Sequence, residues 1–246
     1  MAEASVPAPI YVWASRVSTI LAAAANLGLL DDDDRASLRP LRDRRAKDSA
    51  TAARILLRLA LSAMMDRRVA PQNWRFARSS SGKPFIKDNS EAIDFSVSHI
   101  DAVVMIAVGR GVGVGIDVET VEQEFEEQIV DHFCHASERK ILGALPAAQR
   151  RRVFLELWTE KEAYTKMLGL GHSFDFQSVC VRNLQKPDEI SAQICVEDFY
   201  FSVDHVLYHA ALAVDRRTDR RPIEIQLVNA LLPDQTTFTA SPATSL

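Results

Sequence analysis

Apolar and polar residues alternate in several short runs, and this pattern predicts strands in three parts of the chain. A β-branched and aromatic run at 10–14 predicts a first strand, and similar patterns predict strands at 93–98, 103–108 and 112–118. Glycines between these middle segments predict turns. Residues 178–214 alternate again and predict further strands near the C-terminal end.

Apolar residues at helical spacing predict long helices between these strands. The strongest pattern covers 47–65, and Asp48 or Ser49 is its expected N-cap. Five apolar residues of this helix are expected to face the core: Ile55, Leu56, Leu59, Ala60 and Ala63. Three further helices are predicted at 122–132, 137–145 and 149–168.

The N-terminal region and the tail carry weaker patterns. Four aspartates at 31–34 predict the solvated start of another helix, because carboxylates are favourable at a helix N-terminus. Residues 17–30 are apolar enough for the core of a signal peptide, but Glu3 and a single Arg16 precede them, so we expect them to belong to the fold. Residues 233–246 are rich in Thr, Ser, Pro and Ala and are predicted to be disordered.

Two segments of the chain resemble each other. FSVSHIDAVVMIAVGR at 95–110 and FSVDHVLYHAALAVDR at 201–216 agree at seven of sixteen positions without gaps, at a separation of 106 residues. The second copy has Asp204 in place of Ser98, and a carboxylate repels phosphate, so only the first copy is expected to bind one. The repeat predicts two similar α+β halves with a site in the cleft between them, an N-terminal subdomain at 1–112 and a C-terminal subdomain at 113–232.

Composition limits the class of protein. The chain has 246 residues, 47% hydrophobic and 25% charged, with a net charge of −4, which is typical of a soluble protein of one large or two small domains. The negative charge argues against general nucleic-acid binding, and the uncharged stretch at 102–109 is too short to span a membrane. Cys134, Cys180 and Cys195 match no disulfide or zinc pattern and are predicted to be buried, reduced thiols of a cytoplasmic protein.

An apolar strand that runs into two acids is the first candidate site. Asp117 and Glu119 are two residues apart on this strand, so their side chains project from the same face, about 7 Å apart at Cα. Two carboxylates so placed repel each other unless a cation or a proton lies between them. Their oxygens suit Mg²⁺, which binds through one or two carboxylates together with substrate phosphates. The alternative is an ordinary strand end before an acidic helix.

The helix predicted at 149–168 supplies a second set of polar residues. Trp158, Glu162 and Lys166 are four residues apart and form one stripe. Glu–Lys pairs at this spacing commonly give only a little support to a surface helix. The Trp on the same stripe indicates instead that the acid and the lysine face the interior or a cleft.

Ser98 and His99 end another predicted strand, and both side chains can donate a hydrogen bond to phosphate. An isolated histidine is most often structural, and Lys83 in the Gly-Lys-Pro loop at 82–84 favours a phosphate site only modestly. The chain has no Gly-x-x-x-x-Gly-Lys-Ser/Thr loop, and 109–115 does not fit the dinucleotide fingerprint, so neither common nucleotide site is expected.

In combination, these segments resemble the Sfp-type 4′-phosphopantetheinyl transferases. That family combines a Gly-Lys-Pro loop, a Ser-His strand end, a Gly-(apolar)-Asp-(apolar)-Glu strand and a helix that reads Trp-(Ser/Cys/Thr)-x-Lys-Glu-(Ala/Ser)-x-x-Lys. The last two motifs together are highly specific, and the resemblance covers about 10–214. The chain has all four motifs in this order: Gly82-Lys83-Pro84, Ser98-His99, Gly115-Ile116-Asp117-Val118-Glu119 and 158–166.

The resemblance implies a fold and an activity. The fold is a pair of α+β subdomains related by pseudo-twofold symmetry, with coenzyme A and Mg²⁺ (or Mn²⁺) bound between them. The activity is Mg²⁺-dependent transfer of 4′-phosphopantetheine from coenzyme A to a serine of an apo acyl, peptidyl or aryl carrier protein. A complete site can form within one chain of this length, so a monomer is expected, with no nucleic-acid or membrane partner.

The resemblance also implies roles for individual residues. Asp117, Glu119 and Glu162 would hold the metal, and Glu162 would also be the base for the carrier serine. Phosphate contacts would come from Lys83 and Lys166, and contacts with the phosphate on the ribose from Ser98 and His99, while Lys161 would be peripheral.

The chain departs from the family pattern in the expected contacts with coenzyme A. Many members have an arginine nine residues before the position of Arg58, where this chain has Ser49, so Arg45 or Lys47 is expected to substitute. Residues 133–138 also fit the family pattern only loosely.

Two other classes of function remain open at this stage. One is a non-catalytic module of the same fold that binds coenzyme A or a carrier. The other is an unrelated Mg²⁺-dependent phosphoryl-transfer or hydrolytic enzyme that uses the same acids. A degenerate module is expected to lose at least one of the three acids, and all three are present, which favours catalysis.

Overall fold

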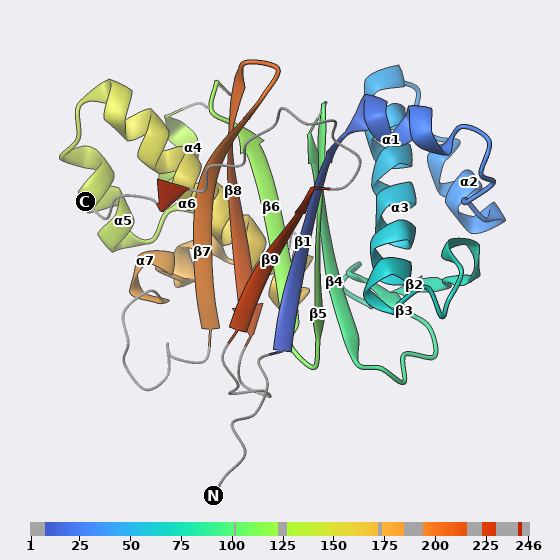
Figure 1. Ribbon diagram of the computed structural model, residues 1–246. Helices are drawn as coiled ribbons and strands as arrows, with labels where there is room; N and C mark the ends of the chain where they lie inside the picture. Colours follow the sequence, from blue (N-terminus) through green and yellow to red (C-terminus); the bar gives the residue numbers. More distant parts are fainter. Residues whose placement is uncertain are drawn as a thin grey trace, which may run out of the picture.

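Two β-sheets pack against each other, and helices cover their outer sides (Figure 1). The computed structural model describes residues 8–100, 102–122, 127–171, 174–184, 194–215, 223–229 and 241–242. The strand order is β4-β5-β1-β9 in one sheet and β10-β7-β8-β6 in the other. The shared core between them is apolar, with Ile10 and Met105 of the first sheet and Ile116 and Leu212 of the second all buried.

Both halves of the chain follow the same order of a strand, helices and a hairpin. In the first half these elements are β1 (Ala8–Arg16), α1 (Val17–Ala24), α2 (Asp32–Leu38), α3 (Arg44–Met64), a small pair β2 (Phe76–Arg78) and β3 (Pro84–Ile86), and the hairpin of β4 (Ile93–Ile100) and β5 (Val103–Arg110). In the second half they are β6 (Gly113–Thr120), α4 (Gln128–Phe133), α5 (Ala136–Gly143), α6 (Ala147–Leu168), α7 (Val181–Leu184), and the hairpin of β7 (Ile194–Val203) and β8 (Val206–Asp215).

The pairing of the strands is also the same in the two halves. The first strand pairs antiparallel with the second strand of the hairpin, β1 with β5 and β6 with β8. The long helices α3 and α6 occupy corresponding places in the order of elements. The predicted α+β class with two similar halves is therefore confirmed, while the pseudo-twofold axis and the subdomain boundary at 113 stay predictions.

The gapless alignment of the internal repeat is wrong at its polar positions. Ser98 lies within strand β4, whereas Asp204, its predicted equivalent, lies in the two-residue turn between β7 and β8. Asp204 and His205 both have positive φ there, 51° and 68°. The copies therefore share their topology but not the register of the FSV segment.

The C-terminal part of the chain returns to both sheets. β9 (Ile223–Asn229), which falls within the predicted C-terminal subdomain, pairs parallel with β1 of the first sheet. β10 (Ser241–Pro242), within the predicted disordered tail, pairs with β7, and the other residues of 233–246 lie outside the described residues.

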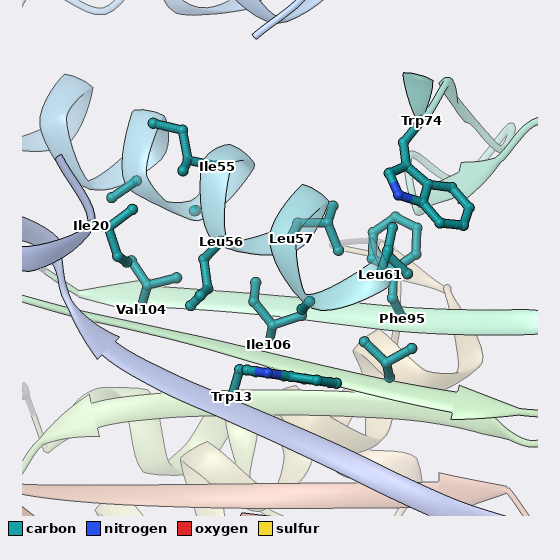
Figure 2. Close-up of a cluster of buried hydrophobic side chains, with 14 of the residues drawn as sticks. Trp13, Ile20, Ile55, Leu56, Leu57, Leu61, Trp74, Phe95, Val104 and Ile106 are labelled. Carbon is teal, nitrogen blue, oxygen red and sulfur yellow. The ribbon is translucent and has the colours of Figure 1, made fainter. Parts of the chain in front are cut away.

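Helix α3 covers the outer face of the first sheet (Figure 2). Leu56 and Leu61 of the helix pack with Ile106 and Trp13 of the sheet in one buried cluster. The predicted core face is confirmed for Ile55, Leu56 and Ala60, but Leu59 is only half-buried and Ala63 is exposed.

The N-cap of helix α3 lies five residues before Asp48, the earlier of the two predicted N-caps. Asp43 is the N-cap, and its carboxylate accepts a hydrogen bond from the backbone N–H of Ala46 at 2.8 Å. The expectation of Asp48 or Ser49 was wrong because the first turn is polar and exposed and therefore carries no apolar periodicity. A side-chain cap can fix a helix start without any apolar residue near it.

The aspartate run at 31–34 does start helix α2, but it is not wholly solvated. Asp31 and Asp34 form a capping box, and Asp34 is buried. Arg58 of α3 is fully buried and donates to Asp34 and Asp31 at 2.6 Å and 2.7 Å. A buried guanidinium needs carboxylate partners, so these acids serve the fold.

Several other predicted boundaries need correction. α4 begins at Gln128, well after the predicted start at 122, and 123–126 lie outside the described residues. The predicted strand region at 178–214 includes helix α7 near its start, and the first strand described in it begins at Ile194. All three cysteines are free as predicted, but only Cys134 is buried.

Candidate functional site

The two halves meet where strand β4 lies along the edge of strand β6. Alternate side chains of β4 accept hydrogen bonds from backbone N–H groups of β6, namely Asp94 from Val114 at 2.9 Å, Ser96 from Ile116 at 3.0 Å and Ser98 from Val118 at 3.3 Å. The side chains thus satisfy an edge that would otherwise leave buried N–H groups unpaired. They also fix the position of Asp117 and Glu119 relative to Ser98.

Gly115 sets the distance between β6 and helix α6. A Cβ atom at this position would lie 1.9 Å from the carbonyl oxygen of Ala163 and 2.5 Å from the backbone nitrogen of Met167. Only glycine permits so close an approach of helix and strand. The close contact brings the helix stripe of Trp158, Glu162 and Lys166 beside the acidic end of the strand.

We expect Gly115→Ala to destabilise the protein by about 1–3 kcal/mol, because α6 must move away from β6. The measurement is the free energy of unfolding in urea. Gly113→Ala is the matched control on the same strand, since its nearest contact would be the Cβ of Asp215 at 3.3 Å. Equal losses in the two variants would contradict the role of Gly115.

A pocket of about 320 Å³ opens at the ends of β4 and β6 and contains most of the predicted polar residues. Asp117, Glu119 and Lys166 come from the second half, and Ser98 and His99 come from the first. The predicted cleft between the halves therefore brings these five residues together. Asp117 and Glu119 line the same pocket, as the alternation of strand side chains indicates.

Lys166 joins the acids directly. Its ammonium donates to Asp117 Oδ1 at 2.6 Å and to Ser98 Oγ at 3.1 Å, and Ser98 Oγ donates to the same carboxylate oxygen at 2.9 Å. Asp117 is only 4% exposed. Its second oxygen, Oδ2, is buried without a hydrogen-bond partner among the described residues.

The pKa of Glu119 records the crowding of negative charge. Burial and then the charge of Asp117 raise this pKa to about 7, with a further contribution from Glu162. A hydrogen bond from Trp158 and the charge of Lys166 act in the opposite direction. The other two predicted metal ligands therefore both lie within electrostatic reach of Glu119.

The chemistry of these donors fits Mg²⁺. An unpartnered buried carboxylate oxygen on Asp117 and a repelled neighbour on Glu119 both favour a cation, and Mg²⁺ needs only one or two protein carboxylates beside substrate phosphate. Among the described residues, no three His, Cys, Asp or Glu side chains form a group that could hold a metal. Glu162 as a third ligand therefore stays a prediction.

His99 lies at the rim of the same pocket. Partial burial of its ring, followed by the positive charges of Lys166 and Arg54, lowers its pKa, although much of the residue reaches solvent. A neutral imidazole beside two cations can still donate one hydrogen bond to an anion.

A second pocket of about 390 Å³ continues from the first, since Val97 and Lys166 line both. The Gly-Lys-Pro loop forms one of its walls, and Gly169 and Gly171 after α6 form another. Lys83 bonds to Asp94 at 2.7 Å and to the carbonyl oxygen of Met167 at 3.0 Å. An ammonium has three N–H donors, so one remains for a ligand.

The predicted basic substitutes Arg45 and Lys47 line neither pocket and lie on the exposed first turn of α3. Two other arginines are nearer. Arg78 lines the second pocket, and Arg54 is close enough to lower the pKa of His99. Neither arginine was predicted from the sequence, because neither belongs to one of the four motifs.

Lys161 is buried in the fold, away from the two pockets. It is 1% exposed, bonds to Glu138 at 2.7 Å and donates to the carbonyl oxygens of Phe133, Phe176 and Val179. Lys161 lines neither pocket, so its expected place outside the site stays a prediction, while its burial in the fold was not foreseen.

No helix in the described part of the chain is long and apolar enough to cross a membrane.

Comparison with known proteins gives consistent matches for both halves. A model of the 4′-phosphopantetheinyl transferase superfamily matches residues 113–215, and a model of the N-terminal part of 4′-phosphopantetheinyl transferases matches 13–110. The 4′-phosphopantetheinyl transferase pptA of Paxillus involutus is 28% identical over 52% of the chain and 56% of the relative. The 4′-phosphopantetheinyl transferase HetI of Nostoc sp. is 32% identical over 49% of the chain and 52% of the relative.

A third relative, the L-aminoadipate-semialdehyde dehydrogenase-phosphopantetheinyl transferase of Eremothecium gossypii, is 30% identical over 66% of the chain and 64% of the relative. The chain spans between 52% and 64% of the length of these three relatives. The two family models together contain every residue that lines the first pocket. The chain belongs to the 4′-phosphopantetheinyl transferase superfamily.

Proposed function

We propose that this protein transfers the 4′-phosphopantetheine group of coenzyme A to a serine of an apo carrier protein and releases adenosine 3′,5′-bisphosphate. The observation that carries the proposal is the pocket in which Asp117, Glu119 and Lys166 of one half meet Ser98 and His99 of the other. An enzyme that binds and cleaves a diphosphate ester needs carboxylates to hold a cation and hydrogen-bond donors to contact the phosphates, and this pocket contains both.

The two connected pockets suit a long, charged ligand. We assign the diphosphate to the first pocket, beside Asp117, Glu119 and Lys166. His99 and Ser98 would contact the phosphate on the ribose, and Lys83 would contribute its remaining donor to a phosphate. Arg54 and Arg78 are better placed than Arg45 and Lys47 to add positive charge near this ligand.

The reaction would be an in-line displacement at the phosphorus that bears the pantetheine arm. The serine oxygen of the carrier forms the new P–O bond, and the bond to the oxygen of adenosine 3′,5′-bisphosphate breaks. Glu162 takes the proton of the serine hydroxyl, directly or through a water molecule. Mg²⁺, or Mn²⁺ in its place, would be held by Asp117, Glu119 and Glu162 and would neutralise the diphosphate and the leaving phosphate.

The residues of the chain have separate tasks in this scheme. Lys166 supplies fixed positive charge where negative charge develops. The ladder between β4 and β6 holds the phosphate donors and the acids in one register, so that little reorganisation is needed when the ligand binds.

Mass spectrometry of an apo carrier tests the transfer. The carrier is incubated with the protein, coenzyme A and Mg²⁺, and we expect a mass gain equal to one phosphopantetheinyl group on its serine. Acyl, peptidyl and aryl carriers are compared, because the sequence does not select among them. No gain with any of them, while coenzyme A binds, would favour a non-catalytic module.

We expect the Michaelis constant for the carrier to rise with salt, by about tenfold between low and high ionic strength. The exposed first turn of α3 carries Arg44, Arg45 and Lys47, and an acidic carrier would be attracted to such a surface. The measurement is the initial rate against carrier concentration at several salt concentrations. A constant that does not change with salt would indicate apolar docking.

A further inference from the structure

The ammonium of Lys166 lies where it would be close to a metal ion bound by Asp117. Its ammonium lies 2.6 Å from Asp117 Oδ1, in an ion pair with the most buried of the three predicted metal ligands. A divalent cation on the same carboxylate would lie next to this ammonium, and like charges at that distance repel each other, the more so beside a buried carboxylate. The acidic site is thus already partly neutralised by a cation that belongs to the chain.

The side chain of Lys166 has the freedom to leave. It is 32% exposed, whereas the carboxylate of its partner Asp117 is 6% exposed, so the lysine is the member of the pair with open space to turn into. Lys166 also lines both pockets, and its flexible stem therefore lies beside the space that we assign to the diphosphate. A diphosphate would offer the ammonium an anion of higher charge than Asp117.

We propose that Lys166 is a tethered cation that occupies the acidic site until a diphosphate arrives, and that it couples the binding of Mg²⁺ to the binding of that diphosphate. The inference rests on the proposed function only for the identity of the ligand. When Lys166 turns to the phosphates, Asp117 loses its ion pair and keeps two oxygens for the metal. Mg²⁺ alone binds weakly, and the two ligands then bind with positive cooperativity.

The test measures Mg²⁺ binding to the full chain without coenzyme A, by isothermal titration calorimetry and by the shift of the melting temperature. Lys166→Gln is expected to bind Mg²⁺ alone about tenfold more tightly than the wild type, within the usual range of coupling between two sites. Lys166→Arg, which keeps the charge, should stay as weak as the wild type. Lys83→Gln is the control, because Lys83 bonds to Asp94 and not to a predicted metal ligand.

Inorganic pyrophosphate then serves as the second ligand. In the wild type it should tighten Mg²⁺ binding more than it does in Lys166→Gln, after the affinity of Mg²⁺ for pyrophosphate in solution is subtracted. Lys166→Met, another neutral side chain of similar length, replaces Lys166→Gln if the latter does not fold. Equal or weaker Mg²⁺ binding in the neutral variants would overturn the inference, as would tight binding of Mg²⁺ alone to the wild type.

The failure of this inference can be told apart from the failure of the proposed function. If the wild type transfers the group to a carrier but Lys166→Gln binds Mg²⁺ no more tightly, the tethered cation is ruled out and the proposed activity stands. If Lys166→Gln binds Mg²⁺ more tightly but the wild type transfers nothing to any carrier, the tethered cation stands and the proposed activity is ruled out.

Discussion

Asp117→Asn is expected to lower the rate of carrier modification by about 10³-fold, because a metal supplies several kcal/mol of charge stabilisation in the transition state and each 1.36 kcal/mol is a factor of ten. Asn keeps the shape of the side chain and one oxygen acceptor but removes the negative charge. Asp117 is the natural centre of the site, since it is buried, carries an unpartnered oxygen and bonds to Lys166 and Ser98.

The fold should survive this substitution. Repulsion between Asp117 and Glu119 disappears, so the raised pKa of Glu119 should fall towards its ordinary value. The measurements are single-turnover mass spectrometry and the melting temperature. Asp43→Asn is a suitable control, because Asn is as good an N-cap as Asp and Asp43 lines neither pocket. Activity near the wild-type level in Asp117→Asn would indicate that the metal lies elsewhere.

The acidic end of β6 could be predicted from the sequence because strand geometry alone places alternate side chains on one face. The stripe on α6 could be predicted for the same kind of reason, since residues four apart lie above one another on a helix. Trp158 is half-buried and donates to Glu119, and the inference that this aromatic residue turns the stripe towards a cleft is confirmed for Lys166, which lines both pockets. Local periodicity was sufficient for both elements.

Contacts between distant segments could not be predicted. The bond between Lys166 and Asp117 joins residues 49 positions apart, and the ladder from β4 to β6 joins residues about 20 apart. In the sequence, Asp94 and Ser96 look like ordinary polar residues of an alternating strand. In the structure, their side-chain oxygens accept hydrogen bonds from backbone N–H groups at the edge of β6. No local pattern tells a solvated polar side chain from one that replaces a sheet partner.

The start of α3 was predicted wrongly and the burial of Lys161 was not predicted, for related reasons. A cap such as Asp43 depends on backbone geometry outside the helix, and a polar first turn gives no apolar signal. Lys161 and Glu138 stabilise each other inside the fold, and each on its own looks like a surface charge. Buried charges that are paired are visible only when both partners are placed.

Helix α6 links the fold to the proposed chemistry, because its faces carry different tasks. On the stripe of Trp158, Glu162 and Lys166, Trp158 donates to Glu119 and Lys166 lines the pocket. Other faces hold the buried Lys161 and the backbone contact with Gly115. A small shift of the helix would therefore move the proposed base and the phosphate-binding lysine together. Effects on stability and on turnover must be separated in any variant of this helix.

Glu162→Gln isolates the chemical role, because Gln keeps the length of the side chain and removes only its charge and basicity. We expect this variant to lower kcat by about 10²–10⁴-fold if Glu162 is the base, which is the usual contribution of general base catalysis. The measurement is the steady-state rate of carrier modification at saturating coenzyme A and Mg²⁺. The melting temperature should change little, since Glu162 is only half-buried.

The two proposed roles of Glu162 predict different responses to added metal. If Glu162 only helps to hold Mg²⁺, a high concentration of Mg²⁺ should restore most of the rate of Glu162→Gln, because Asp117 and Glu119 still provide two carboxylates. If Glu162 is the base, the rate should remain low at every Mg²⁺ concentration, since no amount of metal replaces the proton acceptor. Near-normal turnover with metal bound at ordinary concentration would remove Glu162 from both roles, and the carrier serine would then have to lose its proton to another group.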